Sequence, residues 1–220
     1  MEEIAELLPT QTTRHSVKKH AILVQQGEVP TQAYVVLHGA FKAYRLSHLG
    51  EEQVVGFRAK GDIFPETWIF GKTTTAMCFF EALEDSEVLS VERSVFLELI
   101  DTHPKLKQEI FDYMTSSYTG MLVRVTALEQ HRAADKILLL MCYLMFCYGK
   151  ETKPGVYTVD LQLTHTTLGG LTGLTRETTT VELGRLKRKN IIQYDSKRFV
   201  IYRHALEREL GDESLPDIKL

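Results

Sequence analysis

The sequence predicts an α+β protein: an antiparallel β-roll, then a long helix, then a winged helix-turn-helix. Short segments rich in Val, Phe, Tyr and Ile, separated by turn residues, run from Ala21 to Val91. An uninterrupted helical pattern follows from Lys105 to about His131. The last third contains two short helical segments around a glycine-containing turn, with a hairpin after them. The expected domains are therefore residues 1–103, 104–131 and 132–220.

Composition is typical of a folded protein without a membrane span. The 220 residues are 44% hydrophobic and 25% charged. No apolar run reaches the length of about 18 residues that a membrane helix needs. The chain starts with Glu2 and Glu3 where a secretory signal would be basic. Its cysteines form no disulfide framework, so we expect a cytoplasmic protein.

Charge is distributed unevenly along the chain. The net charge is −3, but residues 1–131 carry 12 Lys and Arg against 18 Asp and Glu. Residues 132–210 carry 13 basic and 8 acidic residues. Because phosphate attracts Lys and Arg, we expect any contact with nucleic acid in this basic third.

The first domain is predicted to consist of short strands. Glycine and proline separate segments that are rich in β-branched and aromatic residues, which is typical of an antiparallel roll or barrel. A helical pattern follows at Arg93–Asp101, and Pro104 can begin the next helix. The expected strands are Ala21–Gln26, Tyr34–Leu37, Phe41–Leu46, Gln53–Arg58, Thr74–Ala82 and Glu87–Val91.

The segment from Lys105 to about His131 is predicted to be one long helix with a coiled-coil seam. Its apolar residues are spaced alternately three and four apart. The position between two compact segments favours a dimer interface, and packing against its own domain is the alternative. The predicted dimer-seam residues are Phe111, Met114, Tyr118, Met121, Val125 and Leu128.

Three elements are expected before the helix-turn-helix. Ala133–Tyr148 is apolar on nearly every side, which indicates a buried helix. Gly149–Gly155 is charged and contains a proline, so we expect a loop. Val156–Leu163 alternates as a strand does.

The helix-turn-helix is predicted from two capping threonines and the turn between the helices. Thr164 can cap a helix to about Leu171, and Thr175 can cap a second helix from Arg176 to about Lys189. Two short helices joined by a turn with glycine form this motif. The remaining expected elements are the turn Thr172-Gly173-Leu174 and the wing hairpin, Ile191–Tyr194 and Phe199–Tyr202, around Asp195-Ser196-Lys197.

The first turn of the second helix is expected to contact base edges in the major groove. Arg176 can donate two hydrogen bonds to guanine, and Glu177 can accept one from cytosine, with Thr180 one turn further on. A solvated basic face is the alternative for the basic residues at the end of this helix. The residues predicted to set the register on phosphate are Thr164, Thr166, Thr178, Arg185 and Lys187. The capping residue Thr175 completes the predicted DNA-binding set.

These residues carry a resemblance to a known family. Leu174-Thr175-Arg176-Glu177-Thr178, followed by Leu183, Leu186 and Asn190-Ile191-Ile192, resembles the helix-turn-helix of the Crp/Fnr transcription regulators. Gln26-Gly27-Glu28, Gly39, Gly61-Asp62 and Glu66 resemble the cyclic-nucleotide-binding β-roll of that family. The resemblance covers about residues 15–205. It implies a homodimer on a palindromic operator in double-stranded DNA, with RNA polymerase as a further partner and no membrane contact.

The sequence departs from the family at the nucleotide site. Glu66 stands where the family has its glutamate, but Ala76 and Met77 stand where members that bind cyclic AMP carry an Arg-Ser pair. A cyclic phosphate would therefore lose its charged, forked donor. The effector pocket that the resemblance implies lies near Glu66, Ala76, Met77, Phe79, Met121 and Leu122, and we expect it to be mostly apolar.

Other chemistry finds no support in the residues. The oxygen-sensing branch of the family holds an iron–sulfur cluster on cysteines near the N-terminus, but the first cysteine here is Cys78. Cys142 and Cys147 are five residues apart on a helix and so do not share a face, which favours core cysteines over metal ligands. No metal spacing, paired carboxylates or nucleophile–base set supports a third hypothesis, an enzyme built from both domains.

Two functional hypotheses stay open on the sequence. The leading one is a DNA-binding regulator that responds to an effector other than cyclic AMP, or to no ligand. The alternative is a cyclic-nucleotide-responsive regulator with a different phosphate anchor, such as Lys72 or a backbone nest. The cofactor, if there is one, is unknown from the sequence.

Overall fold

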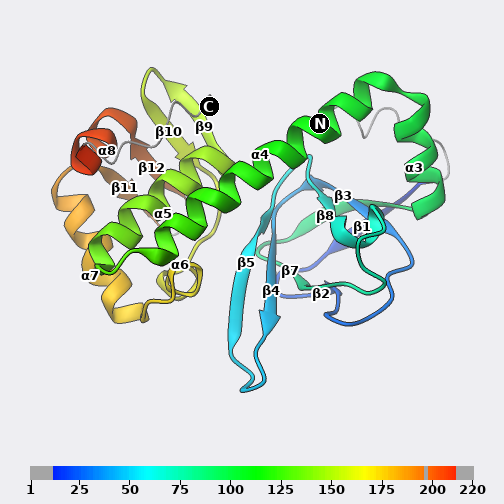
Figure 1. Ribbon diagram of the computed structural model, residues 1–220, viewed down its shortest axis with the longest axis horizontal. Coiled ribbons are helices and arrows are strands. Elements are labelled where there is room, and N and C mark those ends of the chain that lie inside the picture. Colours follow the sequence, from blue (N-terminus) through cyan, green and yellow to red (C-terminus); the bar gives the residue numbers. More distant parts are fainter. Residues whose placement is uncertain (1–11, 196–197, 212–220) are drawn as a thin grey trace. The chain divides into compact units, whose positions relative to one another are not determined.

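The computed structural model describes residues 12–195 and 198–211. The chain divides into two compact units, Met1–Tyr113 and Met114–Leu220 (Figure 1). The division falls within the long helix α4 (Pro104–Glu129). This helix matches the one expected from Lys105 to His131, whereas the domain boundaries at 103 and 131 stay a prediction.

The first unit contains two antiparallel sheets, which confirms the predicted roll (Figure 1). One sheet has the order β1 (Thr13–Val17), β8 (Ser86–Val91), β3 (Ala33–His38), β6 (Ile63–Phe64). The other has the order β2 (Ile22–Val24), β7 (Phe79–Ala82), β4 (Phe41–Leu46), β5 (Glu52–Arg58). In each sheet, a strand from the start of the unit pairs with a strand from its end: β1 with β8, and β2 with β7.

Two apolar clusters hold this unit together. In the first, Phe41 and Phe80 pack around Phe64, whose ring stacks on Phe80 with 4.7 Å between centroids. In the second, helix α3 (Arg93–Thr102) and the first turns of α4 pack on residues of β3 and β8. Burial of this apolar area is the main force that stabilises the roll. The short helix α2 (Glu66–Ile69) follows β6 and contributes Ile69 to the second cluster.

The second unit is a winged helix-turn-helix. Its buried centre is α5 (Ala133–Tyr148), in which every residue from Ile137 to Met145 is buried. The helix-turn-helix consists of α6 (His165–Thr172) and α7 (Arg176–Arg188). Beside them lies an antiparallel sheet of order β11 (Ile192–Tyr194), β12 (Phe199–Tyr202), β10 (Val156–Val159), β9 (Gly149–Lys153), and α8 (Arg203–Leu210) follows.

Three sequence predictions were wrong in their extent. The strand expected over Thr74–Ala82 begins only at Phe79, because Ala76 bonds instead to the loop at Gly27 and Glu28. The charged segment Gly149–Gly155 is not a loop throughout, since β9 pairs with β10. The strand expected to reach Leu163 ends at Val159.

Four elements were not predicted at all: β1, β6, α2 and α8. Strand β1 is exposed except at Val17, so it lacks the apolar alternation that marks a strand. Strand β6 and helix α2 are too short to show a period. Helix α8 buries only Leu206.

Candidate nucleic-acid interface

Threonine side chains fix the start of both helices of the helix-turn-helix. The hydroxyl of Thr164 accepts a hydrogen bond from the backbone N–H of Thr167 at 3.0 Å. The hydroxyl of Thr175 accepts one from the N–H of Thr178 at 3.2 Å. Each bond satisfies a backbone donor that the first helical turn leaves without a partner. Both capping predictions are confirmed.

The turn between α6 and α7 depends on two glycines. Gly173 ends α6 in the left-handed region, at φ 68°, which glycine adopts without the strain that a Cβ introduces. At Gly169 a Cβ would lie 2.6 Å from the carbonyl oxygen of Leu174. The two helices can therefore approach this closely only because position 169 has no side chain.

Helix α7 separates its residues into a buried and an exposed face. Thr179, Leu183 and Leu186 are buried against the rest of the unit. The exposed residues are Arg176, Glu177, Thr180, Val181, Lys187 and Arg188. Because the helix buries its apolar face, its first turn presents Arg176 and Glu177 to solvent, where DNA could reach them.

A hydrogen-bonded pair that the sequence did not predict links the two helices. The hydroxyl of Thr180 donates to the carbonyl of Arg176 at 2.8 Å, and it lies 2.8 Å from Nδ1 of His165. A threonine hydroxyl has a single proton, so Nδ1–H of His165 is the donor in the second bond. Burial, together with the charge of Arg176, lowers the pKa of His165 below its ordinary value. The lowered pKa favours the neutral imidazole over the charged one.

Aromatic residues of the wing join this surface. The ring of Tyr194 on β11 meets that of His165 edge to face and stacks on Phe199. The ammonium group of Lys187 lies 4.8 Å from the centre of the Tyr194 ring, in cation–π contact. Lys187 is thereby held at the exposed surface beside the wing. Ser196 and Lys197 of the predicted wing turn lie outside the described residues.

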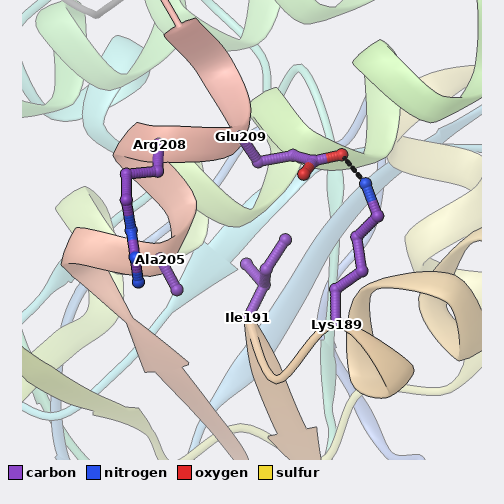
Figure 2. A pocket seen from close by; sticks show the side chains of 5 residues that line it. All are labelled: Lys189, Ile191, Ala205, Arg208 and Glu209. Atoms are coloured by element: carbon purple, nitrogen blue, oxygen red, sulfur yellow. Dashed lines mark hydrogen bonds and ion pairs between the residues drawn. The ribbon is translucent and has the colours of Figure 1, made fainter.

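The end of α7 is tied to α8 by ion pairs. Glu209 binds Lys189 (Figure 2). Glu209 also lies 3.3 Å from Arg185, which is itself 3.5 Å from Glu182. The hollow of about 330 Å³ between these elements is lined by this Lys189–Glu209 pair. Arg185 stays a predicted phosphate contact, although two carboxylates already neutralise it. Lys187 is the better placed of the two.

The remaining predicted contacts lie at or near the helix starts. Thr164, Thr166 and Thr175 are exposed, and Thr178 is half-buried against the cap of α7. Backbone N–H groups and hydroxyls at helix starts commonly bind phosphate oxygens. Their contact with phosphate stays a prediction.

The residues of the expected effector pocket differ in burial and in their contacts. Glu66 is half-buried, lies 2.5 Å from Nε of Arg58 and accepts a hydrogen bond from the hydroxyl of Tyr113 at 3.2 Å. Ala76 is buried and Phe79 half-buried, whereas Met77 is 44% exposed. Arg58 and Tyr113 thus already bind the Glu66 carboxylate, which the family resemblance links to ligand binding. Met121 and Leu122 are exposed residues of α4 in the second unit.

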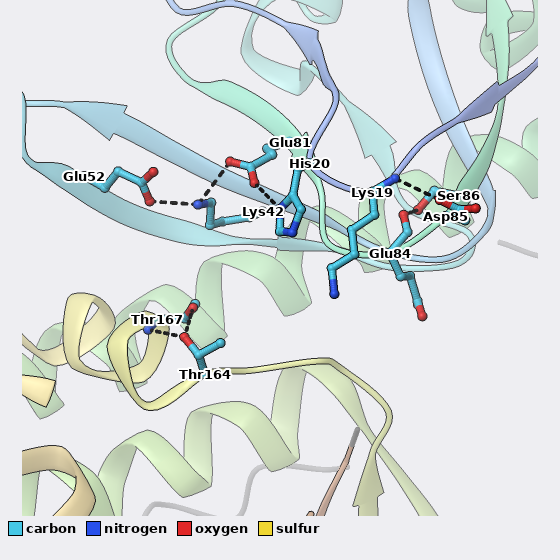
Figure 3. A network of polar contacts seen from close by, with 10 residues as sticks. All are labelled: Lys19, His20, Lys42, Glu52, Glu81, Glu84, Asp85, Ser86, Thr164 and Thr167. Carbon is cyan, nitrogen blue, oxygen red and sulfur yellow. Dashed lines mark hydrogen bonds and ion pairs between the residues drawn. The ribbon is translucent and has the colours of Figure 1, made fainter. Parts of the chain in front are cut away.

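A second polar network stabilises the roll. The ammonium group of Lys42 on β4 lies 2.7 Å from Glu52 and 3.2 Å from Glu81, which also contacts His20 at 3.0 Å (Figure 3). Burial alone would lower the pKa of Lys42, but the hydrogen bonds with both glutamates outweigh it and leave the pKa raised. Because these charges neutralise one another across β4, β5 and β7, we assign the network to structure.

The predicted dimer-seam residues are all exposed along α4. Phe111 and Tyr118 are 64% and 65% exposed, and Met114, Met121, Val125 and Leu128 lie between 38% and 45%. Other apolar residues of the same helix, such as Leu106, Val123 and Ala127, are buried. An exposed apolar stripe is typical of an interaction surface, and the dimer seam stays a prediction.

Metal ions bind to groups of side chains, and membranes are spanned by long apolar helices. Residues 12–195 and 198–211 contain no group of three or more His, Cys, Asp or Glu side chains suited to a metal ion. None of their helices is both long and apolar enough to cross a membrane. Cys78 and Cys142 are buried, and burial raises the pKa of Cys142 to about 12, as for a core thiol.

Comparison with known proteins agrees with this geometry. Residues 14–103 match the cyclic nucleotide-binding domain, and residues 132–209 match the Crp-like helix-turn-helix domain. The chain is 26% identical to electron transport regulator A of Shewanella oneidensis over 190 residues, 86% of this chain and 74% of that protein. It is 26% identical to the fumarate and nitrate reduction regulatory protein of Vibrio cholerae over 200 residues, 90% and 78% of the two chains.

A solved structure shows the same fold. FixK2 from Bradyrhizobium japonicum superposes with a TM-score of 0.72 at 20% identity, covering 90% of this chain and 96% of that one. Along the chain, the cyclic nucleotide-binding match covers the roll before α4, and the Crp-like match covers the winged helix after it. The chain is a DNA-binding transcription regulator of the Crp/Fnr family.

Proposed function

We propose that the protein is a homodimer that binds a palindromic operator with α7 in the major groove of each half-site. The observation that carries this proposal is the capped start of α7, which exposes Arg176 and Glu177 in its first turn. In a helix-turn-helix this turn faces the base edges. Arg176 is proposed to contact guanine and Glu177 cytosine, with half-site centres about 34 Å apart.

The exposed stripe of α4 supports the dimer. Six apolar side chains spaced three and four apart would be buried by the same stripe of a second chain, because a two-fold interface brings identical surfaces together. Such a dimer would place two copies of α7 on one DNA molecule. Its further partner is proposed to be RNA polymerase, and its place of action the cytoplasm.

Control of the regulator is proposed to involve an effector other than cyclic AMP, or no ligand. The supporting contacts are those of the Glu66 carboxylate, which Arg58 and Tyr113 of the protein itself engage. Ala76 and Met77 offer no charged donor to a cyclic phosphate. In calorimetry we expect no cyclic AMP binding tighter than about millimolar. A micromolar dissociation constant would favour the alternative, a cyclic-nucleotide-responsive regulator with another phosphate anchor.

The test of base contact compares two side chains of α7 on DNA selected from random fragments. Arg176→Ala should weaken binding to the selected sequence by about 1–3 kcal/mol and relax the preference at one base pair of each half-site. Lys187→Ala should weaken binding to all sequences alike and reduce the salt dependence by about one charge. Affinities are measured at two salt concentrations, with each base pair of the site varied.

The two variants serve as controls for each other. Both remove a positive charge from an exposed position of the same helix, so they share any general effect of net charge. If Arg176→Ala lowers the affinity for every sequence equally, Arg176 contacts phosphate and the assignment of the base contact is wrong.

A further inference from the structure

Val181 stands apart from the other exposed residues of α7. It is 63% exposed, whereas Leu183 and Leu186 on the same helix are 0% and 3% exposed. Among residues 130–195 and 198–211 it is the one large hydrophobic side chain that is exposed. Single exposed hydrophobic residues are common, so exposure alone assigns it no role; its position on the helix is what matters.

Val181 lies on the face of α7 that carries the proposed base contacts. It follows Glu177 by four residues, so the two side chains share a face one turn apart. Gly184, three residues further on, has no side chain, and a Cβ there would meet only Arg188 at 3.5 Å. No side chain at position 184 therefore projects beside Val181, so another molecule can approach the valine closely.

The neighbouring threonine adds a methyl group and leaves only an acceptor lone pair for polar contact. The only proton of the Thr180 hydroxyl goes to the carbonyl of Arg176, and one of its lone pairs receives the N–H of His165. Thr180 has no donor left for a base edge. Together, Thr180 and Val181 thus offer methyl groups where Arg176 and Glu177 offer hydrogen bonds.

A valine can distinguish bases in one way only. It has neither donor nor acceptor, so the hydrogen-bonding pattern of the major groove gives it nothing to pair with. Thymine is the one unmodified base that presents a methyl group there, at C5. Apolar contact with that methyl removes both surfaces from water, and burying one methyl group corresponds to about fourfold in affinity.

We propose that Val181 is a specificity-determining residue that contacts the C5-methyl group of a thymine beside the base pair contacted by Arg176. This inference rests on the proposed docking of α7 in the major groove. It gives the operator a thymine requirement that depends on shape and apolar contact, next to base pairs recognised by hydrogen bonds.

The experiment removes the methyl group and nothing else. DNA selected from random fragments by the full-length protein is resynthesised with each thymine replaced in turn by deoxyuridine, which keeps every hydrogen-bonding group. Affinities are measured by fluorescence anisotropy for the wild type, Val181→Ala and Val29→Ala. Val29 is the matched control, because it is a similarly exposed valine, 68% against 63% for Val181, in the first unit.

At a thymine beside the base pair that depends on Arg176, deoxyuridine should weaken wild-type binding about fourfold. Val181→Ala should bind both DNAs equally, and Val29→Ala should behave as the wild type. The inference is overturned if no such thymine exists, or if Val181→Ala keeps the full loss. Failure of the protein to select any DNA sequence would instead overturn the proposed function, and this inference with it.

Discussion

Asp62 has the clearest pH signature among the described carboxylates of the roll. It lies in the turn before β6 and accepts a hydrogen bond from the N–H of Ala59 at 2.7 Å. Burial raises the pKa of Asp62 to about 6, although the Ala59 bond and the charge of Arg58 act in the opposite direction. Between its unfolded pKa and about 6, the native state therefore holds more protons than the unfolded chain, and stability falls as pH rises through this range.

Asp62→Asn should consequently increase the free energy of unfolding at pH 7 by on the order of 1–3 kcal/mol. The amide oxygen can still accept from Ala59, so the turn is kept. Urea unfolding at pH 7 and pH 5 checks this: acidification should stabilise the wild type relative to the variant. Asp85→Asn is the control of opposite sign, because a hydrogen bond from Lys18 lowers the pKa of Asp85. Equal pH dependence of wild type and Asp62→Asn would contradict the assignment.

Individual side chains of the site were predictable where the partner lies nearby in sequence. Thr164 and Thr175 cap helices within three residues, and such local bonds leave a sequence signature. The bond between His165 and Thr180 joins residues on different helices. The pairing of Arg185 with Glu209 depends on α8, which the sequence analysis did not find. Contacts of this kind follow only from the packing of the elements.

Gly169 sets how closely α6 and α7 pack. The Cβ of Gly169→Ala would lie 2.6 Å from the carbonyl oxygen of Leu174 and 3.1 Å from the hydroxyl of Thr179. A backbone carbonyl cannot rotate away as a side chain can. The backbone N–H of Leu174 also donates a hydrogen bond to the carbonyl of Gly169 at 3.0 Å, which fixes the position of Leu174. We expect a destabilisation of about 1–3 kcal/mol, as for other overpacked sites. Thermal and urea unfolding measure it.

Gly184→Ala is the matched substitution on the neighbouring helix. Its Cβ would meet only the guanidinium of Arg188 at 3.5 Å, an ordinary contact. Alanine is the better helix former, so α7 should gain about 0.5–1 kcal/mol. If both variants change stability in the same direction, close packing at Gly169 does not control this motif.

Whole elements were predictable where mostly apolar residues gather in one segment of the sequence. Strand β4 and helix α5 have the predicted ends, since both contain a run of buried, mostly apolar residues. Strand β9 was predicted as a loop because it is exposed along most of its length and is held by backbone pairing with β10. Backbone hydrogen bonds require no particular side chains, so an exposed edge strand gives little signal.

The whole molecule combines an acidic sensor-like unit with a basic DNA-binding unit on one long helix. The uneven charge predicted which part would meet DNA, and the helix-turn-helix lies in that basic part. The order of strands in the roll was not predictable. Strand β1 pairs with β8 from the far end of the domain, and no local pattern specifies which distant strand will be its neighbour.

Dimerisation through α4 is the prediction that governs the whole molecule. Met114 and Val125 both belong to the exposed stripe, so Met114→Glu with Val125→Glu should bury unpaired carboxylates against their symmetry mates. We expect sedimentation to show a monomer with weak operator binding, since one α7 alone reaches only one half-site. Ser116→Glu with Thr126→Glu adds the same charge at exposed positions of α4 outside the stripe and should remain dimeric. A dimeric Met114→Glu, Val125→Glu variant, or a monomeric wild type, would show that the stripe has another partner.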